Sequence, residues 1–155
     1  MARRVFFSFH FEKDIFRVNQ VRNSNVVAGA NAAGFFDHSE YEEAKKKGAA
    51  AIRRLIERRL ERTTVTIVLI GKETAERKWV REEIDLSIAR RNGLLGIYIH
   101  HLPDMTGDSS WFAGPDPAVP EGVPFPKYKW DKDLVRFSEA IEAAAKRAEA
   151  WRDED

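Results

Sequence analysis

The stretch TVTIVLI, from Thr64 to Ile70, is the clearest strand in the sequence, and Gly71 ends it. Apolar and β-branched residues fill nearly every position, without the strict alternation of a strand that has one face in water. Such a run is typical of a strand buried on both faces of a parallel sheet. The stretch therefore favours an α/β protein whose helices cover both faces of the sheet.

Strands and helices alternate on both sides of this stretch. Two further buried strands are predicted at RVFFSFH, Arg4–His10, and at LLGIYIH, Leu94–His100. Apolar residues at helical spacing predict four helices, over Asp14–Arg22, Ala49–Arg62, Thr74–Arg91 and Asp131–Trp151.

Weaker signals complete the pattern. A short helix is expected after the capping residues Asp37-His38-Ser39, and short strands at Val26-Val27 and near Phe125–Tyr128. The rest of Leu102–Tyr128, which holds all six prolines, is expected to be mostly loop. The order of elements predicts one domain, residues 1–155, with a flavodoxin-like, doubly wound parallel sheet of four or five strands. Ligands of such sheets bind beyond the carboxyl ends of the strands, near the point where strand order reverses.

Composition narrows the class of protein. The 155 residues contain 26 Lys and Arg against 25 Asp and Glu, so the basic excess of a nucleic-acid-binding protein is absent. The lack of cysteine excludes a disulfide scaffold, a thiolate zinc site and a cysteine nucleophile. No apolar run is long enough to cross a bilayer, and the first residues do not resemble a signal peptide. We therefore expect a cytoplasmic protein with neither a membrane nor a nucleic acid as partner.

The predicted helix that follows the central strand holds the first candidate functional residue. Glu83 lies near Trp79, Leu86 and Ser87 at spacings of three or four residues, on the flank of the apolar stripe. A carboxylate between these side chains and the sheet would be partly desolvated, which raises its pKa and makes it a candidate functional group. The alternative is an exposed helical Glu whose aliphatic part covers Trp79.

The end of the first predicted strand is the second candidate site. At the carboxyl end of a strand, the hydroxyl of Ser8 and the rings of Phe7 and Phe9 could meet a ribose or a base. The alternative is that both phenylalanines belong to the core and Ser8 satisfies a local backbone group.

His100-His101 superficially resembles a metal site, but adjacent strand residues point to opposite faces, so the two rings are not expected to share one ion. Nucleotide-binding glycine motifs and the serine nucleophile elbow are absent from the sequence.

Three stretches together resemble the TIR-like family of small bacterial and archaeal proteins, which includes the TIR proteins of Thoeris antiphage systems. They are Val5–His10 with the helix after it, Gly34–Ser39, and Thr66–Gly71 continued through Trp79-Val80 to Glu83-Ile84. The similarity covers about residues 4 to 102. In TIR domains, a Trp followed by a Glu–hydrophobic pair marks the catalytic helix, so the resemblance implies that Glu83 is the catalytic glutamate.

The resemblance also implies an activity. It implies cleavage of NAD⁺ between nicotinamide and ribose and release of a cyclic or otherwise modified ADP-ribose signal, with NAD⁺ as substrate and no cofactor. Phe7 and Phe9 would enclose a base, Ser8 would bind a ribose or phosphate, Asp37 would line the mouth and Trp79 would lie beside the substrate. The implied partners are an effector protein that responds to the product and a phage-derived trigger.

Two other functions stay open from the sequence. One is a non-catalytic TIR-like module that binds a protein or a nucleotide. The other is a receiver-like phosphoacceptor, which needs an Asp at the end of the central strand. That strand ends Leu69-Ile70-Gly71, so the phosphoacceptor is the weaker alternative.

Overall fold

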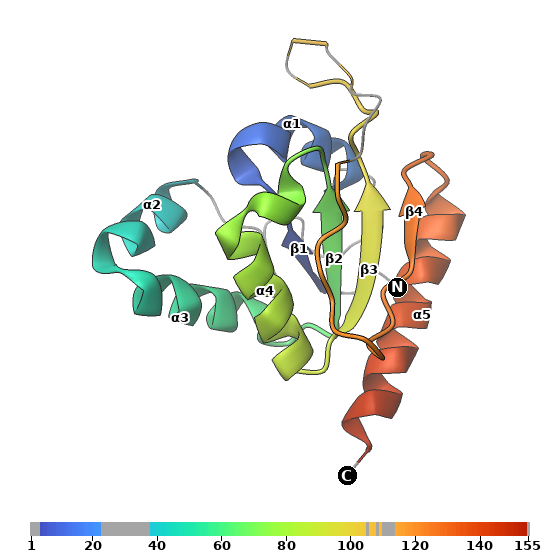
Figure 1. The fold of residues 1–155 in the computed structure, drawn as a ribbon. Helices are drawn as coiled ribbons and strands as arrows, with labels where there is room; N and C mark the ends of the chain where they lie inside the picture. The colour runs from blue at the N-terminus through green and yellow to red at the C-terminus, as the bar shows by residue number, and fades with distance from the viewer. Residues whose placement is uncertain (1–3, 23–37, 105, 108, 110–113, 155) are drawn as a thin grey trace.

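A parallel sheet of four strands forms the centre of the described molecule (Figure 1). The computed structural model describes residues 4–22, 38–104, 106–107, 109 and 114–154. The strands are β1 Val5–Ser8, β2 Val65–Ile70, β3 Gly93–Tyr98 and β4 Lys127–Lys129, in the spatial order β1-β2-β3-β4. The helices are α1 Phe11–Arg22, α2 His38–Lys47, α3 Ala49–Leu60, the 3₁₀ turn η1 Thr74–Glu76, α4 Lys78–Ala89 and α5 Leu134–Arg152.

The central strand β2 is buried at all six positions, as its sequence predicts. It pairs in parallel with β1, where Ser8 lies beside Val68, and with β3, where Leu94 lies beside Thr66. The α/β fold class and the parallel sheet are therefore confirmed.

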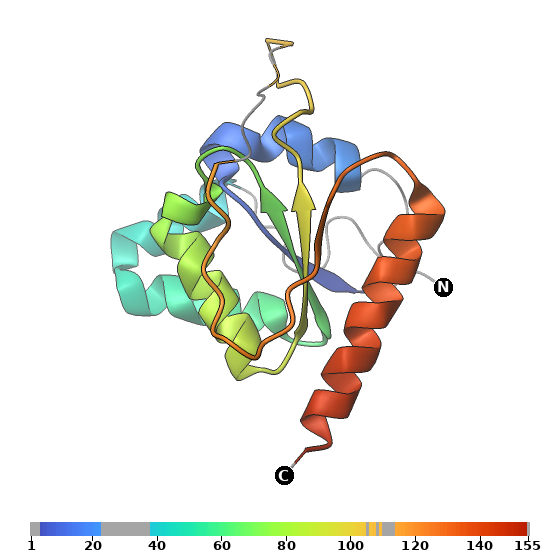
Figure 2. The ribbon, with the colours of Figure 1, turned by 45° about the vertical axis from the view of Figure 1, so that its right-hand side comes forward.

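Each face of the sheet has its own apolar core. Figure 2 shows α5 and α4 on opposite sides of the strands. On the face covered by α1 and α5, apolar side chains of the strands pack against those two helices, among them Phe7, Ile67, Val18 and Phe137. On the other face, Phe6 packs with α3, while Val68 and Ile70 pack with Val80 and Ile84 of α4. Alternate strand residues thus enter different cores.

A proline-rich strap, residues 114–126, covers the part of the α4 face that α4 leaves open (Figure 1). Its side chains Val119, Val123 and Phe125 pack against the core beneath α4. The strap begins at Gly114, whose φ of +73° suits glycine; a Cβ there would lie 2.1 Å from the carbonyl oxygen of Lys72. Gly96 of β3 provides the space under the strap, because a Cβ there would lie 3.0 Å from the ring of Phe125.

Most predicted elements are present with boundaries shifted by a few residues. The expected short strand near Phe125–Tyr128 is β4, and it pairs with β3. The helix predicted over Thr74–Arg91 is wrong as one element: η1 ends at Glu76, Arg77 is extended, and α4 begins at Lys78. The break follows from the turn after β2, where the hydroxyl of Thr74 accepts a hydrogen bond from the amide of Gly71 at 2.7 Å.

The structure does not bear out two expectations about the sheet, a strand at Val26-Val27 and a reversal of strand order. The predicted strand at Val26-Val27 lies outside the described residues, and among the described strands the order does not reverse. In the part of the chain that the structure describes, no helix has both the length and the apolar character needed to span a membrane.

Candidate active site

The carboxylate of Glu83 is buried between α4 and the end of β1. Helix α4 lies against β1, β2 and β3, and Glu83 is 5% exposed on its sheet-facing side. The hydroxyl of Ser8, the last residue of β1, donates a hydrogen bond to Oε1 of Glu83 at 2.8 Å. Ser8 is fully buried, so residues 75 positions apart meet in a site with little water. The alternative of an exposed helical Glu is therefore wrong.

Burial controls the ionisation of this group. Desolvation raises the pKa of Glu83 from its ordinary value of 4.5 to about 8, although the Ser8 hydrogen bond and the positive charge of Arg77 both act to lower it. A carboxyl with this pKa exchanges its proton near neutral pH. Such a perturbed group beside the carboxyl edge of a parallel sheet is a strong candidate for catalysis.

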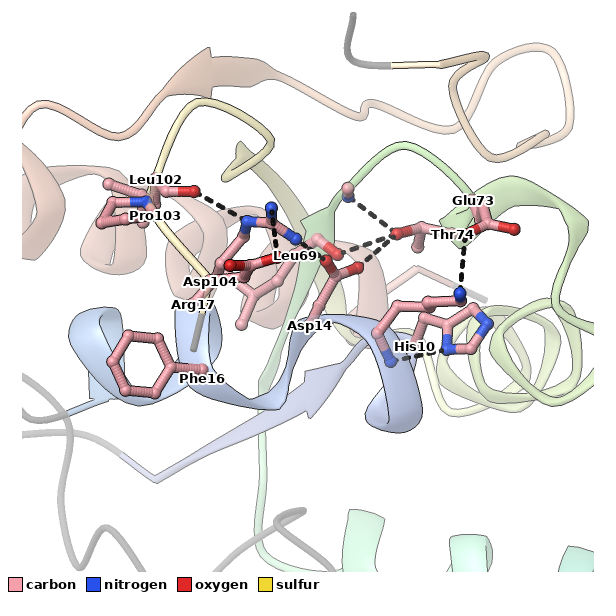
Figure 3. A network of polar contacts seen from close by, with 12 residues as sticks. His10, Asp14, Phe16, Arg17, Leu69, Glu73, Thr74, Leu102, Pro103 and Asp104 are labelled. Atoms are coloured by element: carbon pink, nitrogen blue, oxygen red, sulfur yellow. Dashed lines mark hydrogen bonds and ion pairs between the residues drawn. The ribbon is translucent and has the colours of Figure 1, made fainter. Parts of the chain in front are cut away.

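A second buried carboxylate, Asp14, organises the carboxyl edge of the sheet (Figure 3). Asp14 is 1% exposed and accepts a hydrogen bond from Nη1 of Arg17 at 3.0 Å. Desolvation raises its pKa, against the lowering effect of Arg17, His10 and Thr74. The hydroxyl of Thr74 approaches Oδ2 of Asp14 at 3.4 Å, while Nε of Arg17 donates to the carbonyl oxygen of Leu102 at 2.7 Å.

This arrangement joins the three segments that follow β1, β2 and β3. Figure 3 shows Asp14 between Arg17 on its own helix and Thr74 on the turn after β2. Gly71 is required there, because a Cβ at this position would lie 2.3 Å from Oδ2 of Asp14. The guanidinium of Arg17 is thus engaged with Asp14 and Leu102 within the protein. The contacts of Asp14 and Arg17 therefore hold these three segments together at the carboxyl edge of the sheet.

The remaining predicted site residues do not all gather at Glu83. Phe7 is 3% exposed and packs in the α1–α5 core, on the opposite face of the sheet from Ser8. Phe9 also packs against that core. This geometry does not support a stacking role for Phe7. Trp79 is half-buried on α4 against the α3 core, with Nζ of Lys78 4.9 Å from its ring centroid, and Asp37 lies outside the described residues.

His100 and His101 lie beyond the strand on whose alternation the sequence-based expectation rested. Strand β3 ends at Tyr98, so the alternation of strand side chains no longer applies to them, and their ring centroids lie 5.3 Å apart. Nε2 of His101 lies 2.7 Å from the carbonyl oxygen of Trp130, and burial is the main cause that lowers the pKa of both rings. Within the described ranges, no three side chains of His, Asp or Glu are grouped to hold a metal ion.

Sequence reasoning missed the polar residues beneath α4. Thr66, Ser87 and Asn92 are fully buried and hydrogen-bonded to one another. A threonine inside the apolar run of β2 was the available signal, since a buried hydroxyl needs a partner on the element that covers it.

Comparison with known proteins agrees with this fold. Residues 6–104 match the family described as "Thoeris protein ThsB, TIR-like domain". A protein of Bacillus cereus (strain MSX-D12), named "Putative cyclic ADP-D-ribose synthase ThsB1", is 49% identical over 119 residues. That match covers 76% of this chain and 62% of the relative, so the chain spans less than two thirds of the relative's length. The matched region contains Ser8 of β1 and all of α4 with Glu83. The chain therefore belongs to the TIR-like domain family of the Thoeris protein ThsB.

Proposed function

We propose that this protein cleaves NAD⁺ at the bond between nicotinamide and ribose and forms a cyclic ADP-ribose-type product. The observation that supports the proposal most is the buried Glu83 carboxyl, held by Ser8 at 2.8 Å beside the carboxyl edge of the sheet. The relative from Bacillus cereus is named for the synthesis of cyclic ADP-D-ribose, which is the product class we propose here.

Cleavage of the bond to nicotinamide requires one negative charge in a site that excludes water. When the bond to nicotinamide breaks, positive charge develops on the ribose ring, as in glycoside cleavage. An ionised carboxylate next to the anomeric carbon stabilises that charge, and the low water content strengthens the attraction. Nicotinamide leaves as a neutral molecule, so no group has to donate a proton to it. Exclusion of water favours attack by an atom of the same ADP-ribose over hydrolysis.

The pKa of Glu83 couples substrate binding to ionisation. With a pKa of about 8, most free protein at pH 7 carries a protonated Glu83. The nicotinamide ring of NAD⁺ is cationic, and a positive charge near the carboxyl lowers its pKa. Binding of NAD⁺ therefore releases a proton and generates the charged carboxylate where it is needed.

The roles of the site residues follow from this proposal. Glu83 is the catalytic residue, and Ser8 fixes the orientation of its carboxyl group. Trp79 and Asp37 are proposed to bind the substrate, whereas Phe7 and Phe9 pack on the opposite face of the sheet from Ser8. NAD⁺ is the substrate and no cofactor is required.

The biological setting is part of the same proposal. We infer that the product is a signal for a separate effector protein in cytoplasmic antiphage defence, released in response to a phage-derived trigger. The family membership supports this setting, since Thoeris is the system after which the family is described.

The test compares Glu83→Gln with Glu82→Gln. Gln keeps the shape of the side chain and removes its charge, and Glu82 is the matched control on the next position of α4, where it pairs with Arg53 at 3.2 Å. Purified proteins are incubated with NAD⁺, and phage-infected cells carrying each variant are extracted. Mass spectrometry then measures NAD⁺ loss, nicotinamide and cyclic products.

We expect Glu83→Gln to lower product formation at least about 100-fold, because it removes the charge that stabilises the transition state. Glu82→Gln should retain activity. Equal product from Glu83→Gln and the parent contradicts the catalytic role. NAD⁺ binding without turnover in both purified protein and infected cells would leave a non-catalytic binding module.

A further inference from the structure

A chain of buried polar groups connects the central strand to the backbone of the catalytic helix. Nδ2 of Asn92 donates to Oγ1 of Thr66 at 3.1 Å, and Oγ1 of Thr66 donates to Oγ of Ser87 at 2.7 Å. Oγ of Ser87 donates in turn to the carbonyl oxygen of Glu83 at 2.7 Å. Thr66, Ser87 and Asn92 have no exposed surface. The chain thus ends on the residue whose carboxylate we propose as catalytic.

The hydrogen bonds of this chain all run in one direction. Each hydroxyl accepts one hydrogen bond and donates the next, so neither has a spare proton to offer elsewhere. Hydrogen bonds arranged in this way polarise one another in a low-dielectric interior. Two hydroxyls in an interface that is apolar apart from them and the Ser8–Glu83 pair fix its geometry more narrowly than interchangeable aliphatic contacts would.

Two hydrogen bonds, Ser8–Glu83 and Thr66–Ser87, join α4 to the sheet, and the distance between them is similar along β2 and along α4. Ser8 lies beside Val68 in the sheet, and Thr66 is two residues earlier on the same face of β2, which is about 6.6 Å along a strand. Glu83 and Ser87 are four residues apart on α4, which is about 6 Å along a helix. Because β2 and β3 are parallel, the helix between them runs back toward the amino edge, so Ser8–Glu83 and Thr66–Ser87 form two matching attachment points.

Asn92 closes the arrangement at the end of α4. Its backbone amide donates to the carbonyl oxygen of Ser87 at 3.0 Å, and its Nδ2 also donates to Oγ1 of Thr63 at 3.0 Å. Its Oδ1 accepts from Nη2 of Arg152, near the end of α5, at 2.6 Å. The side chain of Asn92 therefore uses both amide protons and its oxygen within the protein.

We propose that Thr66, Ser87 and Asn92 are positioning residues for Glu83, which hold α4 at the height and rotation that keep the Glu83 carboxyl on Ser8. The catalytic meaning of this inference rests on the proposed function, whereas the structural part does not. A shift of α4 by a fraction of a helical turn would separate Glu83 from Ser8 and admit water to the carboxyl. Rates are sensitive to such shifts, because displacement of a catalytic group by about 1 Å can cost about 100-fold.

The test uses Thr66→Val, which removes the hydroxyl and keeps the branched shape that suits a strand. Thr66→Ser keeps the hydroxyl and serves as the conservative rescue, and Ser87→Ala interrupts the chain from the helix side. Ile84→Val is the matched control, since Ile84 is equally buried on α4 but lies outside the polar chain. Carbon-13 NMR of the side-chain carboxyl follows the titration of Glu83, whose signal is assigned by its loss in Glu83→Gln.

We expect Thr66→Val and Ser87→Ala to lower the titration midpoint of Glu83 by one pH unit or more, because burial is the largest cause of its elevation. Among the described residues, Arg77 is the charged group that acts on the pKa of Glu83, and both variants retain it. Thr66→Ser and Ile84→Val should leave the midpoint close to that of the parent. In the NAD⁺ assay, Thr66→Val should lower kcat about tenfold with little change in KM.

The outcomes separate the two proposals. An unchanged midpoint in folded Thr66→Val and Ser87→Ala overturns the positioning role, and so does an equal change in Ile84→Val. If the parent never consumes NAD⁺ but Thr66→Val and Ser87→Ala still lower the titration midpoint of Glu83, the positioning role is supported and the proposed reaction is rejected.

Discussion

Removing the charge of Glu83 should make the folded protein more stable, and the gain should grow with pH. The folded protein holds the Glu83 proton up to about pH 8, while the unfolded chain releases it near the ordinary value of 4.5. Between these two values the unfolded state binds fewer protons, so the stability of the parent falls as pH rises. Above pH 8 both states are ionised and the loss stops growing.

The size of the effect follows from the same two pKa values. This difference in pKa corresponds to a total loss in the free energy of unfolding on the order of 5 kcal/mol. About 3 kcal/mol of this loss develops between pH 5 and pH 8. Glu83→Gln has no proton to lose in this range and can still accept the hydrogen bond from Ser8. The free energy of unfolding of Glu83→Gln should therefore exceed that of the parent by about 3 kcal/mol more at pH 8 than at pH 5.

Urea unfolding at pH 5, 6.5 and 8, followed by far-UV circular dichroism, measures this difference. Glu82→Gln is the control, because the carboxylate of Glu82 forms an ion pair with Arg53 at the protein surface. If the free energies of unfolding of Glu83→Gln and the parent differ by the same amount at all three pH values, the folded protein does not hold the proton of a buried Glu83 above pH 5. The assay needs no substrate, so its result does not depend on the proposed reaction.

Three further predictions concern the reaction and the packing. If ionised Glu83 is required, kcat/KM for NAD⁺ should rise about tenfold per pH unit below pH 8 and level off above it; a flat profile from pH 6 to 9 would argue against the role. Ser8→Ala removes a hydrogen bond that lowers the pKa of Glu83, so the midpoint of that profile should move to higher pH, and a shift to lower pH would contradict the assignment. Gly93→Ala places a Cβ 2.0 Å from the carbonyl oxygen of Ala144 on α5, so we expect urea unfolding to show a loss of roughly 3 kcal/mol in the free energy of unfolding. A free energy of unfolding equal to that of the parent would show that α5 can move away and would contradict the prediction.

The sheet was predictable because burial leaves a simple pattern. A run such as Thr64–Ile70 has too few polar residues for a strand with a wet face, and the helices between the strands follow from apolar spacing. The neighbours of Glu83 on α4 made its burial one of two alternatives, since side chains three and four residues apart share a face, but spacing did not decide between burial and exposure.

The site was predictable only in part, because side-chain direction depends on where a strand ends. Alternation puts Ser8 on one face of β1 and Phe7 on the other, so Phe7 could have been assigned to the core from sequence. The same rule does not apply to His100 and His101, because β3 ends before them. The partners of Asp14 come from turns after three strands, and no local pattern predicts such a meeting.

The strap over the α4 face shows how an irregular segment can cover an apolar surface. A segment without regular structure normally has amide groups that need partners, and an apolar face offers none. The strap contains five of the six prolines of the chain, Pro115, Pro117, Pro120, Pro124 and Pro126, and a proline has no amide hydrogen to leave unsatisfied. A helix avoids unsatisfied amides by pairing them internally, and proline avoids them because it has no amide hydrogen. A thin, extended segment can therefore cover this apolar face where a further crossover helix would otherwise lie between β3 and β4.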